Sequence, residues 1–248
     1  MITVLCATKG EQKPVGLEFV PVNNDAGIPV MGATISVVPN SDYHECHAKP
    51  WAVAANTLLD GCPGDALFLD DDIELTPWAF SQFERYRGQA DIIGFSLFRP
   101  TAQGLALQSA GFQFMKTGDG AGAMLMPLTS MVDLLRPCYV AHVTASCMYL
   151  SDKVIRSGLR FPVWPGQHHE DVAFTYEAWL RGFKVMHLPG LVIHHMPDAG
   201  TVGATKSKDA GFENDRMVNW AMLQKWQVDN NIMDEIGKRI PLGAVPVI

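Results

Sequence analysis

Three consecutive aspartates, Asp70, Asp71 and Asp72, follow the short apolar run at residues 66–69. Side chains alternate across a β-strand, so Asp70 and Asp72 are expected on one side and Asp71 on the other. Two carboxylates that close repel unless a proton or cation lies between them, and Mg²⁺ or Mn²⁺ prefers oxygen ligands. The triplet therefore predicts a metal site. The alternative is that one aspartate caps the next helix and the others are solvated.

A second acidic pair, Glu170 and Asp171, lies in the first turn of a predicted helix. The helix dipole alone favours carboxylates there, which is a sufficient structural explanation. The functional interpretation makes Asp171 a general base that faces a cleft. Farther along, a predicted strand ends in His194 and His195. A histidine at that place is often a packed or capping residue, but its imidazole can also complete a metal shell of mixed oxygen and nitrogen ligands.

The elements that must position these residues alternate between strand and helix in the first hundred residues, which is typical of an α/β sheet with parallel strands. In such sheets, ligands bind beyond the carboxyl ends of the strands, where the aspartates lie. The helix at 77–87 opens with Thr76 as its cap and Pro77 as its first residue. The expected strands are 2–8, 16–22, 33–39, 66–69 and 91–98, and the expected helices are 48–60 and 77–87.

The second half is expected to contain a long buried strand, three helices and two shorter strands near the histidines. Gly182 is the predicted stop of the central helix, whose buried face carries Val172, Tyr176, Trp179 and Leu180. A glycine-rich loop is expected at 116–124 and a flexible one at 197–211. The expected strands are 108–115, 139–150, 184–189 and 191–195, and the helices begin at Ser151 as a cap, at 170 and at about 212.

Composition limits the function classes. The 248 residues suffice for one domain with a short appendage. A formal charge of −7 disfavours nonspecific nucleic-acid binding, and the five cysteines form no CxxC pair. No apolar run is long enough for a spanning helix, and the first residues do not read as a secretion signal, so a cytoplasmic protein is expected.

The pieces "FLDDD", "ASCMYLSDKVIRSGLRF" and "HHEDVAFTYEAWLRGFKVMHLPGLVIHH" occur in an order that resembles family 2 glycosyltransferases of the GT-A fold, most closely the nonprocessive rhamnosyltransferase-like members. The resemblance covers roughly residues 2–99 and 140–196. It implies an α/β fold with a central, mostly parallel sheet flanked by helices. The catalytic domain would span 1–196, with a nucleotide-binding half at 1–99 and an acceptor half at 100–196, followed at 197–248 by a lid loop and a C-terminal helix.

The resemblance also implies roles. Asp171 would deprotonate the acceptor with support from Glu170, and Asp72 would ligate a Mn²⁺ or Mg²⁺ ion that bridges the donor diphosphate. His194 would be a further ligand, with Asp70 and His195 as fallbacks. The implied donor-binding residues are Thr8, Asn23, Asn24, Asp25, Asp70 and Asp71. The implied acceptor-binding residues are Trp164 and His169.

The implied reaction is the inverting transfer of one sugar from a UDP-, dTDP- or GDP-sugar to a hydroxyl of a glycan, a lipid-linked glycan or a protein. The Gln-x-x-Arg-Trp signature of processive synthases is absent, which favours a single transfer. Lys206 and Lys208 would close over the diphosphate as part of the lid. Two alternatives stay open: transfer to a hydroxymethylated DNA base, which the acidic charge disfavours, and a noncatalytic module that binds nucleotide sugars.

Overall fold

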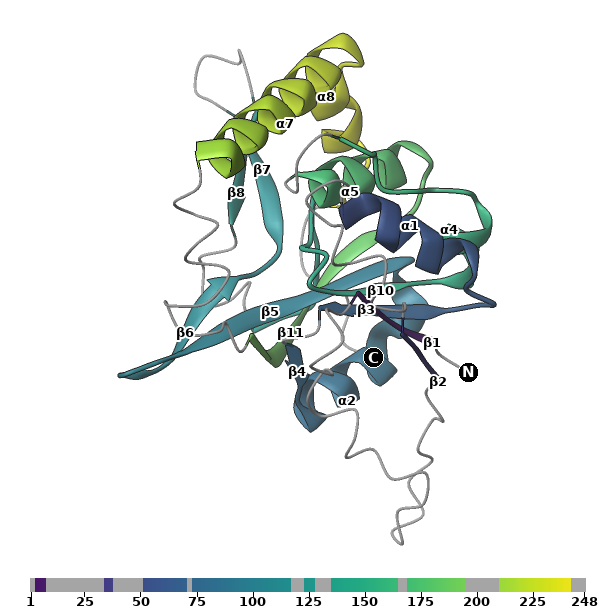
Figure 1. Cartoon of the computed structure of the whole chain (residues 1–248), viewed down its shortest axis with the longest axis vertical. Coiled ribbons are helices and arrows are strands. Elements are labelled where there is room, and N and C mark those ends of the chain that lie inside the picture. The colour runs from purple at the N-terminus through teal and green to yellow at the C-terminus, as the bar shows by residue number, and fades with distance from the viewer. Residues whose placement is uncertain are drawn as a thin grey trace, which may run out of the picture.

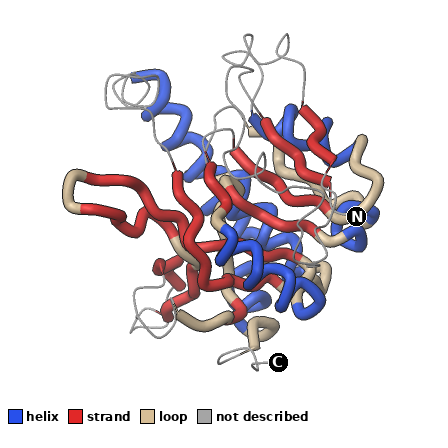
Figure 2. The backbone as a smooth tube through the Cα atoms, turned by 90° about the horizontal axis from the view of Figure 1, so that it is seen from below, coloured by secondary structure: helices blue, strands red, loops and turns tan. Residues whose placement is uncertain are grey.

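A mixed β-sheet with helices on both faces organises the molecule (Figures 1 and 2). The computed structural model describes residues 3–7, 34–37, 51–70, 73–116, 123–127, 135–164, 169–194 and 210–241. Within these ranges, the large sheet has nine strands. They are β1 (Thr3–Ala7), β2 (Thr34–Val37), β3 (Ala66–Asp70), β4 (Ile73–Leu75), β5 (Ile92–Thr101), β6 (Gly104–Ser109), β9 (Cys138–Tyr139), β10 (Cys147–Leu150) and β11 (Val185–His194).

The strand order is β2-β1-β3-β10-β5-β11-β4, with β6 beside β5 and β9 beside β11. Strands β1, β2 and β3 are parallel, and so are β5 and β11. Because β10 runs antiparallel to both β3 and β5, those two strands point the same way, and the carboxyl ends of β3, β5 and β11 lie at one edge. The predicted α/β fold with a central sheet flanked by helices is confirmed, and β10 makes the sheet mixed.

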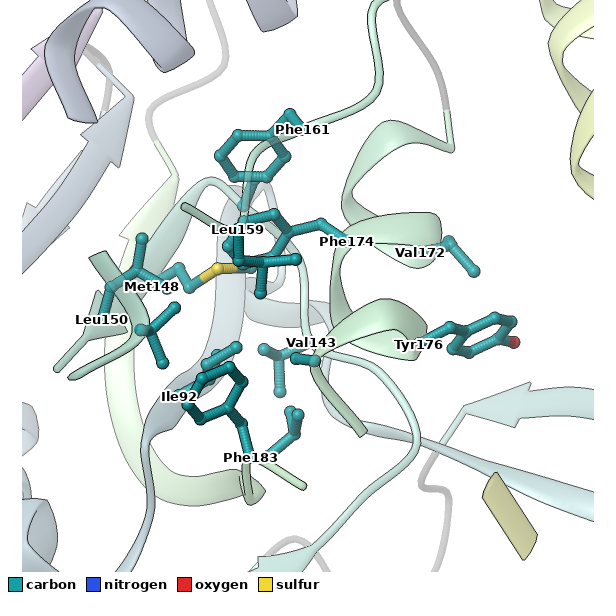
Figure 3. Packing of buried hydrophobic residues seen from close by; sticks show 14 of the residues in the cluster. Ile92, Val143, Met148, Leu150, Leu159, Phe161, Val172, Phe174, Tyr176 and Phe183 are labelled. Atoms are coloured by element: carbon teal, nitrogen blue, oxygen red, sulfur yellow. The ribbon is translucent and has the colours of Figure 1, made fainter. Parts of the chain in front are cut away.

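Helices cover the two faces unequally. On one face lie α1 (Trp51–Asp60), α4 (Asp152–Arg156), α5 (Glu170–Leu180) and α8 (Ile232–Gly237), and on the other lies α2 (Pro77–Tyr86). The strand side chains alternate between these layers: Ile92 packs in the α5 core (Figure 3), whereas Ile93 and Phe95 pack in the α2 core. A separate hairpin, β7 (Phe112–Lys116) with β8 (Ala123–Pro127), leads toward α7 (Ala210–Asp229).

The helix ends test the caps and stops that the sequence predicted. Thr76 caps α2 as predicted, since its Oγ1 accepts the Ala79 amide at 3.3 Å. Gly182 ends α5 with a φ of 83°, which glycine adopts without strain. The cap predicted at Ser151 is wrong in detail: its side chain makes no capping hydrogen bond, and the Asp152 amide donates to Asp65 Oδ1 at 2.7 Å. A side chain distant in sequence thus supplies the cap of α4.

Two strand predictions are wrong. The expected strand at 139–150 is two short strands, because the chain leaves the sheet after Val140 and bonds to β7; the Ala141 amide donates to the Phe112 carbonyl at 2.8 Å. The two strands expected at 184–195 are one, β11, whose register shift between Leu188 and Val192 absorbs Pro189 and Gly190. Proline cannot donate to a ladder, so an irregularity accommodates it.

The region at 108–115 also differs from the single expected strand. It is divided between β6 and β7 at Gly111, where an added Cβ would lie 2.8 Å from the Cβ of His187, so only glycine fits. The C-terminal helix is confirmed as α7, and α8 was not predicted. The expected strand at 16–22, residues 117–122 of the expected loop and residues 197–209 lie outside the described ranges. Among the helices that are described, none is long and apolar enough to cross a membrane.

Candidate active site

Asp171 lies in the first turn of α5, at the end of the helix that faces the carboxyl edge of the sheet. Its Oδ1 accepts the Val172 amide at 2.9 Å, one of the N–H groups that lack an acceptor at a helix start. Its Oδ2 accepts the Ala145 amide at 3.3 Å. These two donors fix the carboxylate on the helix end, while its side chain is still about a quarter exposed. An oriented, partly accessible carboxylate is suited to remove a proton from a bound hydroxyl.

Residues 140–146, here called the bridge segment, connect this carboxylate with the acidic end of β3. The Asp70 amide donates to the Ser146 carbonyl at 3.0 Å, and the neighbouring Ala145 amide binds Asp171. Alternation along β3 places the Asp70 side chain on the same face as Phe68, which lies in the α5 core. Two acidic residues about a hundred positions apart in sequence are therefore held by consecutive residues of one segment.

His142, also in the bridge segment, is a site residue that the sequence analysis missed. Its ring is buried, with Nδ1 at 3.1 Å from the Thr175 hydroxyl and Nε2 at 3.7 Å from Asp171 Oδ2. Burial lowers the pKa of His142, and the nearby carboxylate of Asp171 opposes this shift only in part. The neutral imidazole is therefore the stable form at neutral pH. The motif "VAHVT" gave no signal, since one histidine in an apolar run is usually a core residue.

Glu170 and His169 precede Asp171. Glu170 is buried. His169 has a φ of 70°, a left-handed conformation that is uncommon outside glycine and turns the chain into the helix. Its ring lies 5.0 Å from that of Trp220 in α7, with the planes inclined by 55°. Trp220 was not singled out among the tryptophans of the sequence, and it brings the C-terminal helix to the start of α5.

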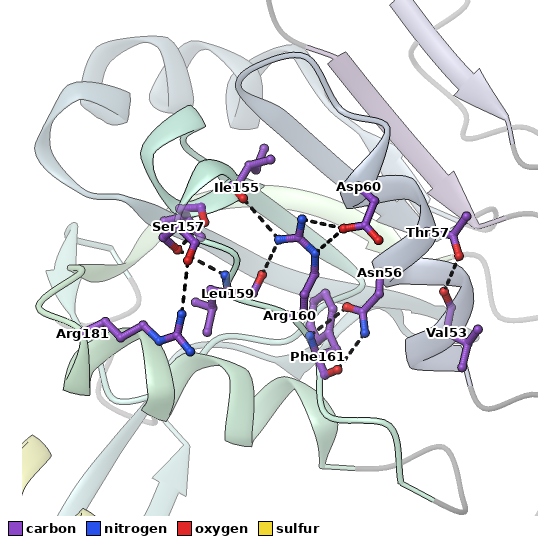
Figure 4. Close-up of polar contacts among 11 residues, drawn as sticks. Val53, Asn56, Thr57, Asp60, Ile155, Ser157, Leu159, Arg160, Phe161 and Arg181 are labelled. Carbon is purple, nitrogen blue, oxygen red and sulfur yellow. Dashed lines mark hydrogen bonds and ion pairs between the residues drawn. The ribbon is translucent and has the colours of Figure 1, made fainter.

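Trp164, the other predicted acceptor residue, is half-buried and packs against the α5 core. The chain leading to it is held to α1: the Phe161 amide and carbonyl both bond the Asn56 side chain, at 2.9 and 2.8 Å (Figure 4). Arg160 pairs with Asp60 at the end of the same helix. Residues 160 and 161, which lead to Trp164, are thus attached to α1.

His194 ends β11, where its register partner is Ile73 in β4. Its Nδ1 lies 2.9 Å from Gln108 Oε1. An amide oxygen can only accept, so Nδ1 carries the hydrogen and the lone pair is on Nε2, the tautomer that can ligate a metal. Within the described residues, no group of three or more His, Cys, Asp or Glu side chains could hold a metal ion. The predicted site residues outside those ranges are Thr8, Asn23, Asn24, Asp25, Asp71, Asp72 and His195.

Comparison with known proteins finds similarity in structure but not in sequence. No protein-family model and no curated protein matches the sequence. Among solved structures, that of GalNAc-T7 with UDP, GalNAc and Mn²⁺ superposes with a TM-score of 0.52 at 12% identity, over 82% of this chain and 45% of that one. The chain therefore spans less than half the length of the GalNAc-T7 chain. It has a GT-A fold.

Two further solved structures are similar to this GT-A chain at lower TM-scores. The S. aureus TarS fragment 1–349 gives 0.44 at 14% identity, over 78% of this chain and 60% of that one. A197 from STIV gives 0.38 at 12% identity, over 75% and 81%.

Proposed function

We propose that the protein is a metal-dependent, inverting glycosyltransferase that moves one sugar from a nucleoside-diphosphate sugar to an acceptor hydroxyl. The observation that carries the proposal is the convergence on the bridge segment, where Ala145 holds Asp171 and Ser146 holds the acidic end of β3. A catalytic base and a donor site must lie close together for direct displacement, and the attachment of Asp171 and Asp70 to neighbouring residues supports this interpretation. The domain division at residue 196 belongs to the same proposal.

Asp171 is the proposed base. It takes the proton of the acceptor hydroxyl, whose oxygen lone pair attacks the anomeric carbon from the face opposite the diphosphate. The bond between that carbon and the phosphate oxygen breaks, and its electron pair leaves with the nucleoside diphosphate, so the anomeric configuration inverts. Glu170, which is buried directly before Asp171, is proposed to support Asp171 as the base.

The metal would be held by Asp72 and His194, with Asp70 and His195 as fallbacks. The donor set fits Mn²⁺ or Mg²⁺, because it combines carboxylate oxygens with an imidazole whose Nδ1 bonds to Gln108, which places the ring lone pair on Nε2. The pairing of His194 with Ile73, the residue after Asp72 in the sequence, supports this ligand pair. When bound, the ion supplies charge neutralisation to the departing diphosphate.

The donor nucleotide is proposed to lie over the ends of β1 and β3. Ala7 is the register partner of Asp70, which supports Thr8, Asp70 and Asp71 as donor-binding residues, because they lie at or directly after these two strand ends in the sequence. Asn23, Asn24 and Asp25 belong to the proposed donor site through the family resemblance alone. The GalNAc-T7 structure was solved with UDP, GalNAc and Mn²⁺, which favours a uridine nucleotide as the first donor to try. The acceptor is proposed to approach between Trp164 and His169, and the contact of Trp220 with His169 adds an aromatic ring to that side.

Incubation with Mn²⁺ and a panel of nucleotide sugars tests the proposal. Slow release of free sugar and nucleoside diphosphate is expected, and it should be lost in Asp72→Ala and His194→Ala and on addition of a chelator. Thermal stabilisation by a nucleotide sugar without turnover under any acceptor would indicate a binding module instead. Release of pyrophosphate from a nucleoside triphosphate would indicate a nucleotidyltransferase.

A further inference from the structure

His142 faces both a helix hydroxyl and the proposed base, and its hydrogen-bond partners fix which ring nitrogen carries the proton. The Thr175 hydroxyl is fully buried and lies 3.0 Å from the carbonyl oxygens of both Asp171 and Val172. The hydroxyl has one hydrogen. That hydrogen points toward the two carbonyl oxygens, because otherwise the hydroxyl oxygen would lie 3.0 Å from both of them with no hydrogen between and would be repelled. The hydroxyl oxygen must then accept, so Nδ1 of His142 is the N–H donor across 3.1 Å.

This tautomer leaves Nε2 of His142 unprotonated, with its lone pair toward Asp171 Oδ2 at 3.7 Å. The separation exceeds hydrogen-bond length, as expected for two acceptors with no proton between them. The ring cannot turn away easily, because it is buried and lies 5.1 Å from the ring of Phe112 at an angle of 33°. The amides of Ala145 and Val172 keep the carboxylate facing Nε2, and a shift of about 0.5 Å would bring a protonated Oδ2 within hydrogen-bond distance of it.

We propose that His142 is a positioning residue for Asp171, whose Nε2 accepts a hydrogen bond from the carboxyl group once Asp171 has taken the proton of the acceptor hydroxyl. The step balances without another reactant: the acceptor O–H bond breaks, an O–H bond forms on Asp171, and that hydrogen is shared with Nε2. The interaction is absent in the carboxylate form and present after proton transfer, so it favours the chemical step rather than substrate binding. This inference rests on the proposed function of Asp171.

The first test needs no substrate. In protein labelled with ¹⁵N-histidine, the His142 signals are assigned by their loss in His142→Asn, and one-bond and multiple-bond ¹⁵N–¹H spectra report the tautomer. The Nδ1–H tautomer is expected at neutral pH, and its preference should disappear in Thr175→Val. An Nε2–H tautomer or an imidazolium at neutral pH would overturn the proposal, because the Asp171-facing atom would then already be a donor.

The second test is kinetic. Asparagine places its amide near the position of Nδ1 and keeps the contact with Thr175, whereas glutamine reaches the position of Nε2. His142→Asn should lower kcat about tenfold, the effect of one hydrogen bond to an ionisable group, with the donor KM unchanged. His142→Gln should recover part of that loss. Equal kcat values for wild type and both variants would refute the positioning role.

The two proposals fail separately. If Asp171→Asn turns over like wild type, the proposed base is wrong, whatever the tautomer of His142. If Asp171→Asn is inactive while His142→Asn is as active as wild type, only the inference about His142 falls. Thr175→Ser, which retains the hydroxyl, is the matched control for Thr175→Val in the spectra and should keep the Nδ1–H tautomer.

Discussion

Gly94, in the middle of β5, lies directly beneath the bridge segment. A Cβ added there would be 2.4 Å from the Cβ of Val143 and 2.7 Å from its Cγ1. Alternation along β5 explains the direction, because Ile92 on the same face also packs in the α5 core with Val143. Since the Cβ of Val143 is fixed to its backbone, no rotamer change relieves the overlap. In Gly94→Ala, the bridge segment must move away from the sheet by roughly 1 Å to reach ordinary contact.

Overpacking of this kind costs about 1 to 3 kcal/mol, and we expect about 3 kcal/mol because backbone has to move. For a chain of this size, each kcal/mol lowers Tm by about 2 to 4 °C, so Gly94→Ala should melt about 6 to 12 °C below wild type by calorimetry. Gly88→Ala is the control: nothing lies within 4 Å of its added Cβ, and its Tm should change little.

The same substitution should affect activity, because Val143 lies two residues before Ala145, whose amide binds Asp171. Donor turnover of Gly94→Ala should fall at temperatures where the variant is still folded. The free energy lost on Gly94→Ala should shrink by at least about 1 kcal/mol in a Val143→Gly background, where the overlapping atoms are gone. Strictly additive costs of the two substitutions would refute the packing argument.

Two further predictions concern stability. Asp65→Ala removes the side chain that accepts the Asp152 amide and should lower the free energy of unfolding, measured by urea titration, by about 1 kcal/mol. Ser151→Ala removes no capping hydrogen bond and should lower it by less. The reverse order would contradict the assignment of the cap to Asp65. Burial lowers the pKa of His187, whose Nε2 lies 2.8 Å from the Ser96 hydroxyl, to about 4, so below pH 6.5 the unfolded chain binds a proton that the folded chain does not. Wild type should therefore lose up to about 3 kcal/mol between pH 6.5 and 4 relative to His187→Gln, and parallel urea-titration curves for the two proteins would contradict this.

Local sequence signals predicted the fold well where the residues that start or end an element lie within that element or next to it. Thr76 and Pro77 mark the start of α2, and Gly182 marks the end of α5 because only a left-handed residue closes that helix. Prediction failed where hydrogen bonds to a segment distant in sequence determine the backbone conformation. An apolar run such as 140–146 reads as one strand, but only its ends bond to the large sheet, at Val185 and Asp70, and the residues between them bond to β7 and α5. Nothing local distinguishes a strand from a buried segment of irregular backbone.

The candidate site was predictable for residues that follow strand ends or open a helix. Asp70, Asp171 and His194 were predicted in this way, since topology alone places such positions at one edge of the sheet. Their roles stay a prediction. His142 could not, because its role depends on the Thr175 hydroxyl one turn along α5 from Asp171. Trp220 reaches the site only through the placement of α7.

The central claim, that Asp171 acts on a donor held at the acidic end of β3, is tested most directly by separating binding from turnover in Asp171→Asn. Glu177→Gln is the matched control, since Glu177 lies on the outer side of the same helix and pairs with Arg181. With Mn²⁺ and the donor selected from the panel, both variants should show the thermal stabilisation of wild type, and only Asp171→Asn should lose sugar release and transfer, by a factor of about 100 or more. Undiminished turnover by Asp171→Asn would contradict the claim, and so would a donor that binds and never reacts with wild type.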